Sequence, residues 1–80
     1  MANTKDTPRA IVIPGGALTI DAYFVPALPA RLRREIPPHG RRYDARARRW
    51  TIAPAWTEIG IAIFRAVFPD AAIITGRGAA

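Results

Sequence analysis

The chain has 80 residues and a net charge of +6, and half of its residues are hydrophobic. A chain of this length forms one domain, and its apolar half argues against global disorder. It has no cysteine and a single histidine, His39, which excludes a disulfide framework and leaves little for a zinc site or a Ser-His-Asp relay. We therefore expect no metal and no cofactor.

No stretch of the sequence predicts membrane insertion or secretion. The longest apolar run, 59–67, is interrupted by Arg65 and is far shorter than a membrane span. The first eight residues lack the apolar core of a signal peptide. These features predict a cytoplasmic protein with no membrane partner.

The first part of the chain predicts one or two strands. Residues 1–8 are polar and predict a disordered lead-in. Ala10–Ile13 is a short β-branched run that predicts a strand. The Pro-Gly-Gly sequence at 14–16 follows it and is a turn signal, which either closes a hairpin with the next run or bends one long edge strand. Ala17–Val25 alternates and predicts a strand whose buried side consists of Leu18, Ile20, Ala22 and Phe24.

Pro26–Ile36 predicts the first helix. Leu28, Leu32 and Ile36 recur every four residues and form its buried stripe. The arginines of this segment lie elsewhere on the helix, and those near its end complement the helix dipole. The Pro-Pro-His-Gly sequence at 37–40 ends the helix.

The next segment predicts a β-hairpin. Its strands are Arg41–Asp44 and Ala47–Ile52, joined at Ala45 and Arg46. With this two-residue loop, Tyr43 opposes Arg48 and Arg41 opposes Trp50. One face of the hairpin then holds Tyr43, Trp50 and Ile52, and the other face holds Arg42, Arg49 and Thr51. The loop lacks the glycine that such turns favour, so a longer type I loop with a shifted register is the alternative.

The last part of the chain predicts a helix and a strand. Pro54 opens the helix at its first position, and its apolar stripe consists of Trp56, Ile59, Gly60, Ile63 and Val67, with Phe64 and Phe68. Ile61 and Ala62 lie off this stripe, so the helix is either the central core helix or partly an interface. Ala71–Thr75 predicts a final strand, and 76–80 predicts a flexible tail.

Together these elements predict a single α/β (α+β) domain over residues 9–75. Their order is β(β)-α-β-β-α-β, which predicts a two-layer sandwich. Two helices would then cover one face of a small, mainly antiparallel sheet.

The net charge is confined to one segment. Residues 25–50 hold eight arginines against Glu35 and Asp44, whereas 1–24 and 51–80 each sum to zero. Charge this localised attracts an anionic polymer, and the planar guanidinium group suits phosphate. A solvated basic face on a small fold is the alternative interpretation. The arginines predicted to contact nucleic acid are Arg31, Arg34, Arg41, Arg42, Arg46, Arg48 and Arg49.

Aromatic residues lie among these arginines. Tyr43 and Trp50 are candidates for stacking on unpaired bases, but they share a face with Ile52, and that placement favours a role as core anchors. Asp44 is interpreted as a turn residue whose carboxylate binds local backbone N–H groups. No two acidic residues form a recognisable pair, so we predict neither catalytic residues nor an enzyme.

The run from Leu18 to Trp56 resembles the HARP domain of annealing helicases and its small stand-alone bacterial and phage relatives. The matching pattern is the alternating strand, a helix rich in Leu and Arg, Arg42-Tyr43-Asp44, a short turn, and Arg49-Trp50-Thr51-Ile52. In that family the basic domain helps to recognise branched or partly single-stranded DNA. The resemblance implies that the residues that take part in DNA recognition are Arg42, Tyr43, Asp44, Arg49 and Trp50. The chain has no helicase motor, so annealing activity is not implied.

These observations predict a small basic module that binds DNA in preference to RNA. Binding would be directed at the backbone, with weak sequence specificity, through the first helix and the 41–52 hairpin. The alternative is a non-catalytic protein-interaction or self-assembling module, a homodimer or higher oligomer. It would use edge strands and the apolar second helix, with Ile61 and Phe64 at the contact. The arginines would then meet an acidic protein partner or keep the oligomer soluble.

Overall fold

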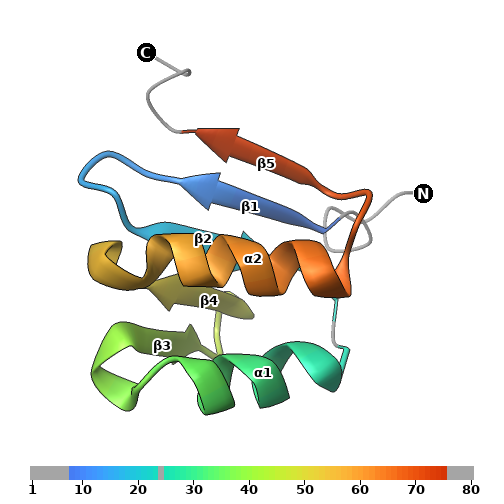
Figure 1. Cartoon of the computed structure of the whole chain (residues 1–80), viewed down its shortest axis with the longest axis horizontal. Helices are drawn as coiled ribbons and strands as arrows, with labels where there is room; N and C mark the ends of the chain where they lie inside the picture. Colours follow the sequence, from blue (N-terminus) through green and yellow to red (C-terminus); the bar gives the residue numbers. More distant parts are fainter. Residues whose placement is uncertain (1–7, 24, 76–80) are drawn as a thin grey trace.

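The computed structural model describes residues 8–23 and 25–75 (Figure 1). The elements, in chain order, are β1 (Arg9–Val12), β2 (Leu18–Asp21), α1 (Ala27–Glu35), η2 (Pro38–Gly40), β3 (Arg41–Asp44), β4 (Arg49–Ile52), η3 (Pro54–Trp56), α2 (Thr57–Val67) and β5 (Ala72–Thr75). Here η2 and η3 are 3₁₀ turns. The predicted α+β sandwich is confirmed. Phe24, the predicted tail and the predicted lead-in except Pro8 lie outside the described residues.

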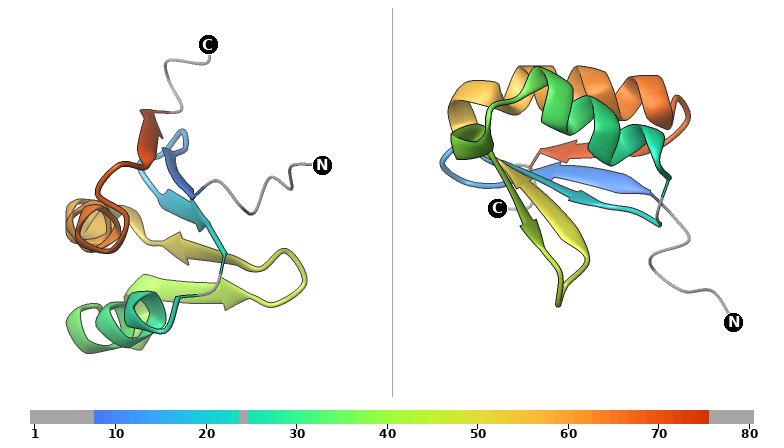
Figure 2. Two further views of the ribbon diagram at one scale, coloured as in Figure 1. Left: turned by 90° about the vertical axis from the view of Figure 1, so that its right-hand side faces the viewer. Right: turned by 90° about the horizontal axis from the view of Figure 1, so that it is seen from below.

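The strands form one mixed sheet in the order β3-β4-β2-β1-β5. β1 pairs parallel with β5, and the other three pairs of neighbours are antiparallel. Both α1 and α2 pack on the same face of this sheet (Figure 2). The opposite face, which we call the open face, carries no helix of the described chain. The edge strands of the sheet are β3 and β5.

A tight turn joins β1 to β2, so the hairpin alternative is the correct one. The Ile13 N–H donates to the Ala17 carbonyl at 2.9 Å, and the Gly16 N–H donates to the Ile13 carbonyl at 2.9 Å. Gly15 and Gly16 have φ angles of 97° and 96°, which glycine adopts without the steric penalty of a Cβ atom. β2 ends at Asp21, earlier than the alternation predicts.

The core lies between the helices and the sheet. The predicted stripe of the first helix is confirmed, since Leu28, Leu32 and Ile36 are buried. They meet buried side chains of the sheet, of α2 and of the residue that follows α2, which are Ala10, Leu18, Ile20, Trp50, Ile52, Ile63, Phe64 and Phe68. This single apolar layer joins all elements into one domain.

The second helix begins later than predicted and is rotated relative to its predicted stripe. Pro54–Trp56 forms η3, and α2 begins at Thr57, whose hydroxyl donates to the Gly16 carbonyl. A Cβ atom at Gly60 would lie 2.9 Å from Leu18 Cδ2, so the backbone of α2 lies close to β2 at this point. With these contacts fixed, Ile59 turns outward and is 37% exposed.

This rotation also corrects the predicted self-association contact. Phe64 is 0% exposed and lies within 5.4 Å of the Phe68 ring, measured between centroids. A side chain in that position contributes to the core and has no surface to offer to a second chain. Ile61 is partly buried and packs against the same core.

Candidate nucleic-acid interface

The β3–β4 hairpin has a four-residue loop. Tyr43 pairs with Trp50 and Asp44 pairs with Arg49, so the loop consists of 45–48. The predicted two-residue loop and its pairing are therefore wrong, and the longer loop is correct. Because the register differs from the predicted one by two residues, the faces keep their predicted side chains: Arg42, Arg49 and Thr51 lie on the open face.

Asp44 holds this loop, as predicted. Its Oδ1 accepts hydrogen bonds from the backbone N–H groups of Arg46 at 3.0 Å and Ala47 at 3.2 Å. The loop closes at Arg48, whose φ of 54° lies in the left-handed region that favours glycine. That conformation costs a non-glycine residue about 1 kcal/mol. Glycine would adopt the backbone conformation of this position at a lower cost than arginine does.

The loop is an exposed tip at one end of the molecule. In both views of Figure 2 the hairpin runs away from the helix layer toward this loop. Arg46 and Arg48 are exposed at the tip, beside the small side chains of Ala45 and Ala47. The tip therefore presents two guanidinium groups on a backbone that another molecule can approach closely.

Arg49 belongs to a row of charges across the open face. Its Nη2 lies 3.6 Å from Asp21 Oδ2, and Arg9 Nη2 lies 3.8 Å from the same oxygen. Asp21 is only 6% exposed, and a buried carboxylate is costly without cationic partners. Arg49 therefore stabilises Asp21, and its substitution would disturb the sheet as well as any ligand contact. Arg42, by contrast, makes no ion pair among the described residues.

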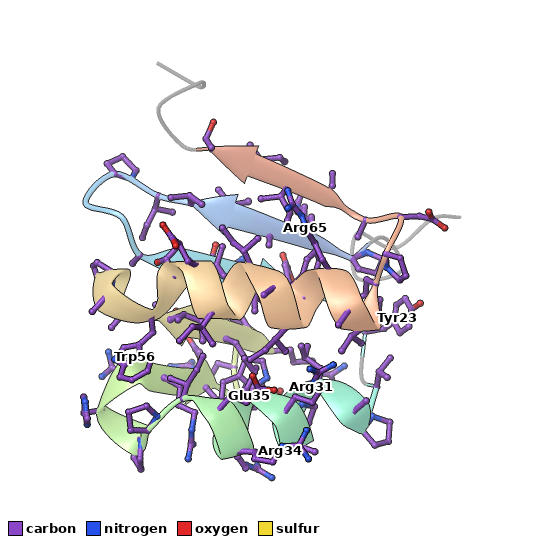
Figure 3. All side chains as sticks on the ribbon, viewed as in Figure 1. Tyr23, Arg31, Arg34, Glu35, Trp56 and Arg65 are labelled. Carbon is purple, nitrogen blue, oxygen red and sulfur yellow. The ribbon has the colours of Figure 1, made fainter. Side chains whose placement is uncertain are left out.

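Among the arginines of α1 and of the segment that follows it, some interact within the protein and others are exposed. Arg31 Nε donates to Glu35 Oε2 at 3.3 Å, and Figure 3 shows this pair on the side of α1 that faces α2. Arg41 Nε donates to the Ile36 carbonyl at 2.9 Å, just beyond the end of α1. Arg34 lies on the outer side of the helix, and its neighbour Arg33, which was not among the predicted contacts, is exposed as well.

The two hairpin aromatics have different environments. Trp50 is 8% exposed and belongs to the core, which confirms the favoured interpretation of this residue as a core anchor. Tyr43 packs against it, with ring centroids 5.1 Å apart, yet is 49% exposed because β3 is an edge strand. Tyr43 is therefore not the core anchor that the sequence favours. Its edge borders a shallow hollow of about 470 Å³ lined by Arg42, Tyr43, Asp44, Ala45 and Thr51.

Trp56 and His39 have structural surroundings. Their rings meet at a centroid distance of 6.3 Å, and a Cβ atom at Gly40 would lie 2.5 Å from Trp56 Cδ1. Within residues 8–23 and 25–75, no three His, Cys, Asp or Glu side chains are grouped so that they could hold a metal ion. Neither helix described here has the length and apolar character needed to cross a bilayer.

The candidate interface is thus narrower than the predicted one. We define the basic end of the molecule as the exposed arginines of α1, β3 and the loop, together with Tyr43: Arg33, Arg34, Arg42, Tyr43, Arg46 and Arg48. Arg31, Arg41 and Arg49, which were among the predicted contacts, each form a hydrogen bond or an ion pair that holds the fold and are not included. Comparisons of this chain with known protein families, with curated proteins and with solved structures found no match.

Proposed function

We propose that this chain is a small, non-catalytic module that binds nucleic acid, DNA in preference to RNA, through its basic end. The observation that carries this proposal is an excess of exposed arginine without acidic partners. Arg33, Arg34, Arg42 and Arg46 form no ion pair within the described part of the chain. The two carboxylates of the same segment are engaged elsewhere, Glu35 with Arg31 and Asp44 in the turn.

Phosphate is the ligand chemistry that fits this arrangement. The guanidinium group offers paired donors that match phosphate oxygens, and positive charge gathered at one end steers a polyanion toward it. Contacts of this kind position the protein on the backbone and carry little sequence information. We therefore expect weak sequence specificity and strong dependence on salt.

The hairpin tip is the part that would approach the nucleic acid most closely. A two-stranded ribbon fits into a major groove about 12 Å wide. Small side chains at 45 and 47 leave room for this approach, and the exposed Arg46 would contact a phosphate of the backbone.

The resemblance to HARP domains supports branched or partly single-stranded DNA as the preferred form. Tyr43, half-exposed beside Arg42, supplies a ring on which an unpaired base can stack. With Trp50 in the core, this proposal assigns stacking to Tyr43 alone of the two hairpin aromatics. We propose a cytoplasmic location for the same activity.

A titration of fluorescently labelled oligonucleotides tests the proposal. Single-stranded, duplex and forked DNA and a matched RNA are titrated with the full chain at several salt concentrations, and anisotropy is recorded. We expect binding to all DNA forms, tightest to the fork, with log K falling linearly as log salt rises, by about 0.7 to 0.9 per phosphate contacted. Absence of binding at low salt, or affinity that does not respond to salt, would refute the proposal.

A further inference from the structure

The two edges of the sheet differ in how they are protected. β3 carries Arg41 and Arg42, and charged side chains on an edge strand discourage pairing with another sheet. β5, at the opposite edge, has the sequence Ala-Ile-Ile-Thr over Ala72–Thr75, with no charge and no proline. Among the described strands it pairs only with β1, so its outer side offers backbone N–H and C=O groups to a further strand.

The side chains of β5 are suited to such pairing. Ile74 is 41% exposed on the open face, beside Ile11 of β1, which is its partner in the register. Ile73 faces the helices and packs against the core from its edge. A β-branched strand with apolar side chains on both faces gains buried area when another strand covers its edge.

We propose that β5 pairs antiparallel with β5 of a second copy, which joins two sheets into one of ten strands. The charge distribution favours a second copy as the occupant. Residues 51–80 have no net charge, and β3, at the basic end, is the strand farthest from β5 in the sheet. Two copies therefore meet through neutral edges, and their basic ends remain far apart despite a charge of +6 on each chain.

Symmetry fixes the form of this dimer. Two identical antiparallel edge strands are related by a two-fold axis perpendicular to the sheet, which keeps both helix layers on the same side. Helix-facing residues then oppose helix-facing residues, with Ile73 opposite Ile73 or Thr75 of the second copy. The two basic ends lie at the two extremes of the joined sheet. The inference goes beyond the proposed function and does not depend on it.

Each copy contributes one strand of four residues to this contact, fewer than the roughly 20 to 30 residues on each side of a standard interface, so we expect a weak dimer that forms only at high concentration. Sedimentation equilibrium of the full chain tests it. We expect an average mass that rises from 8.7 kDa toward twice that value as concentration increases. Ile74→Lys should hold the mass at the monomer value, because it places a charge against the uncharged edge of the second copy. The Ile74→Lys chain must retain the circular dichroism of the original.

Ile59→Lys is the matched control, since Ile59 is the exposed isoleucine of α2. It should leave the association unchanged. A monomer at every concentration of the unmodified chain would overturn the proposal. So would association that survives Ile74→Lys and is lost in Ile59→Lys, because α2 would then be the interface. Neither result bears on oligonucleotide binding, which is measured separately.

Discussion

Replacing Arg42 and Arg46 together by glutamine is expected to weaken binding to duplex DNA by about tenfold to a hundredfold at about 0.1 M salt. Each arginine that contacts a phosphate displaces condensed counterions, so the loss of two contacts lowers the slope of log K against log salt by about 2. Neither guanidinium group has an ion-pair partner among the described residues. The change should therefore leave the melting temperature unaltered, and anisotropy titrations over a salt series measure both quantities.

The control for this variant is an arginine elsewhere on the surface. Arg65 of α2 is exposed, and Figure 3 shows it on the side of α2 away from α1. Arg65→Gln removes the same charge as Arg42→Gln. We expect the slope of log K against log salt to change in Arg42→Gln and to stay the same in Arg65→Gln. Equal losses in both single variants would mean that net charge, and not the basic end, determines affinity. Arg49 is unsuitable here because it pairs with Asp21.

Phe64→Ala is expected to lower the free energy of unfolding by about 3 to 5 kcal/mol. Phe64 is fully buried and packs against the Phe68 ring in the centre of the helix–sheet core. A domain of this size has a total stability of about 5 to 15 kcal/mol, so the loss removes a large part of it. Urea denaturation followed by tryptophan fluorescence measures the change as a lower midpoint.

Ile59→Ala on the same helix is the comparison. Ile59 is partly exposed, so its truncation should cost much less than that of Phe64. The sequence pattern assigns both residues to one buried stripe, whereas the fold separates them. A cost for Ile59→Ala as large as that for Phe64→Ala would contradict the orientation of α2 described here.

The order of elements follows from local patterns in the sequence. Leucine and isoleucine every four residues predict the buried side of α1, and alternation over Leu18–Asp21 predicts the buried side of β2. The Pro-Gly-Gly sequence at 14–16 predicts a turn or a bend, and the structure shows the turn, in which Gly15 and Gly16 have positive φ. These signals are local, because each depends on the geometry of a single helix, strand or turn.

The features that the sequence did not predict depend on contacts between distant segments. The rotation of α2 is set by Thr57 and Gly60 against the β1–β2 hairpin, which an almost uniformly apolar helix does not encode. The ion pair of Arg49 with Asp21 requires the β2–β4 register. An arginine count therefore overestimates the candidate interface, because it cannot separate the arginines that we propose to bind phosphate from arginines that stabilise the fold.

The most direct test of the central claim is to map the nucleic-acid contact residue by residue. Forked DNA is added at low salt to the ¹⁵N-labelled chain, and amide and arginine Nε–H chemical shifts are followed by NMR. We expect the largest changes in the β3–β4 loop, at Arg42 and Tyr43, and on the outer side of α1 at Arg34. Changes concentrated on α2 or β5, or no change at any DNA concentration, would contradict the proposal.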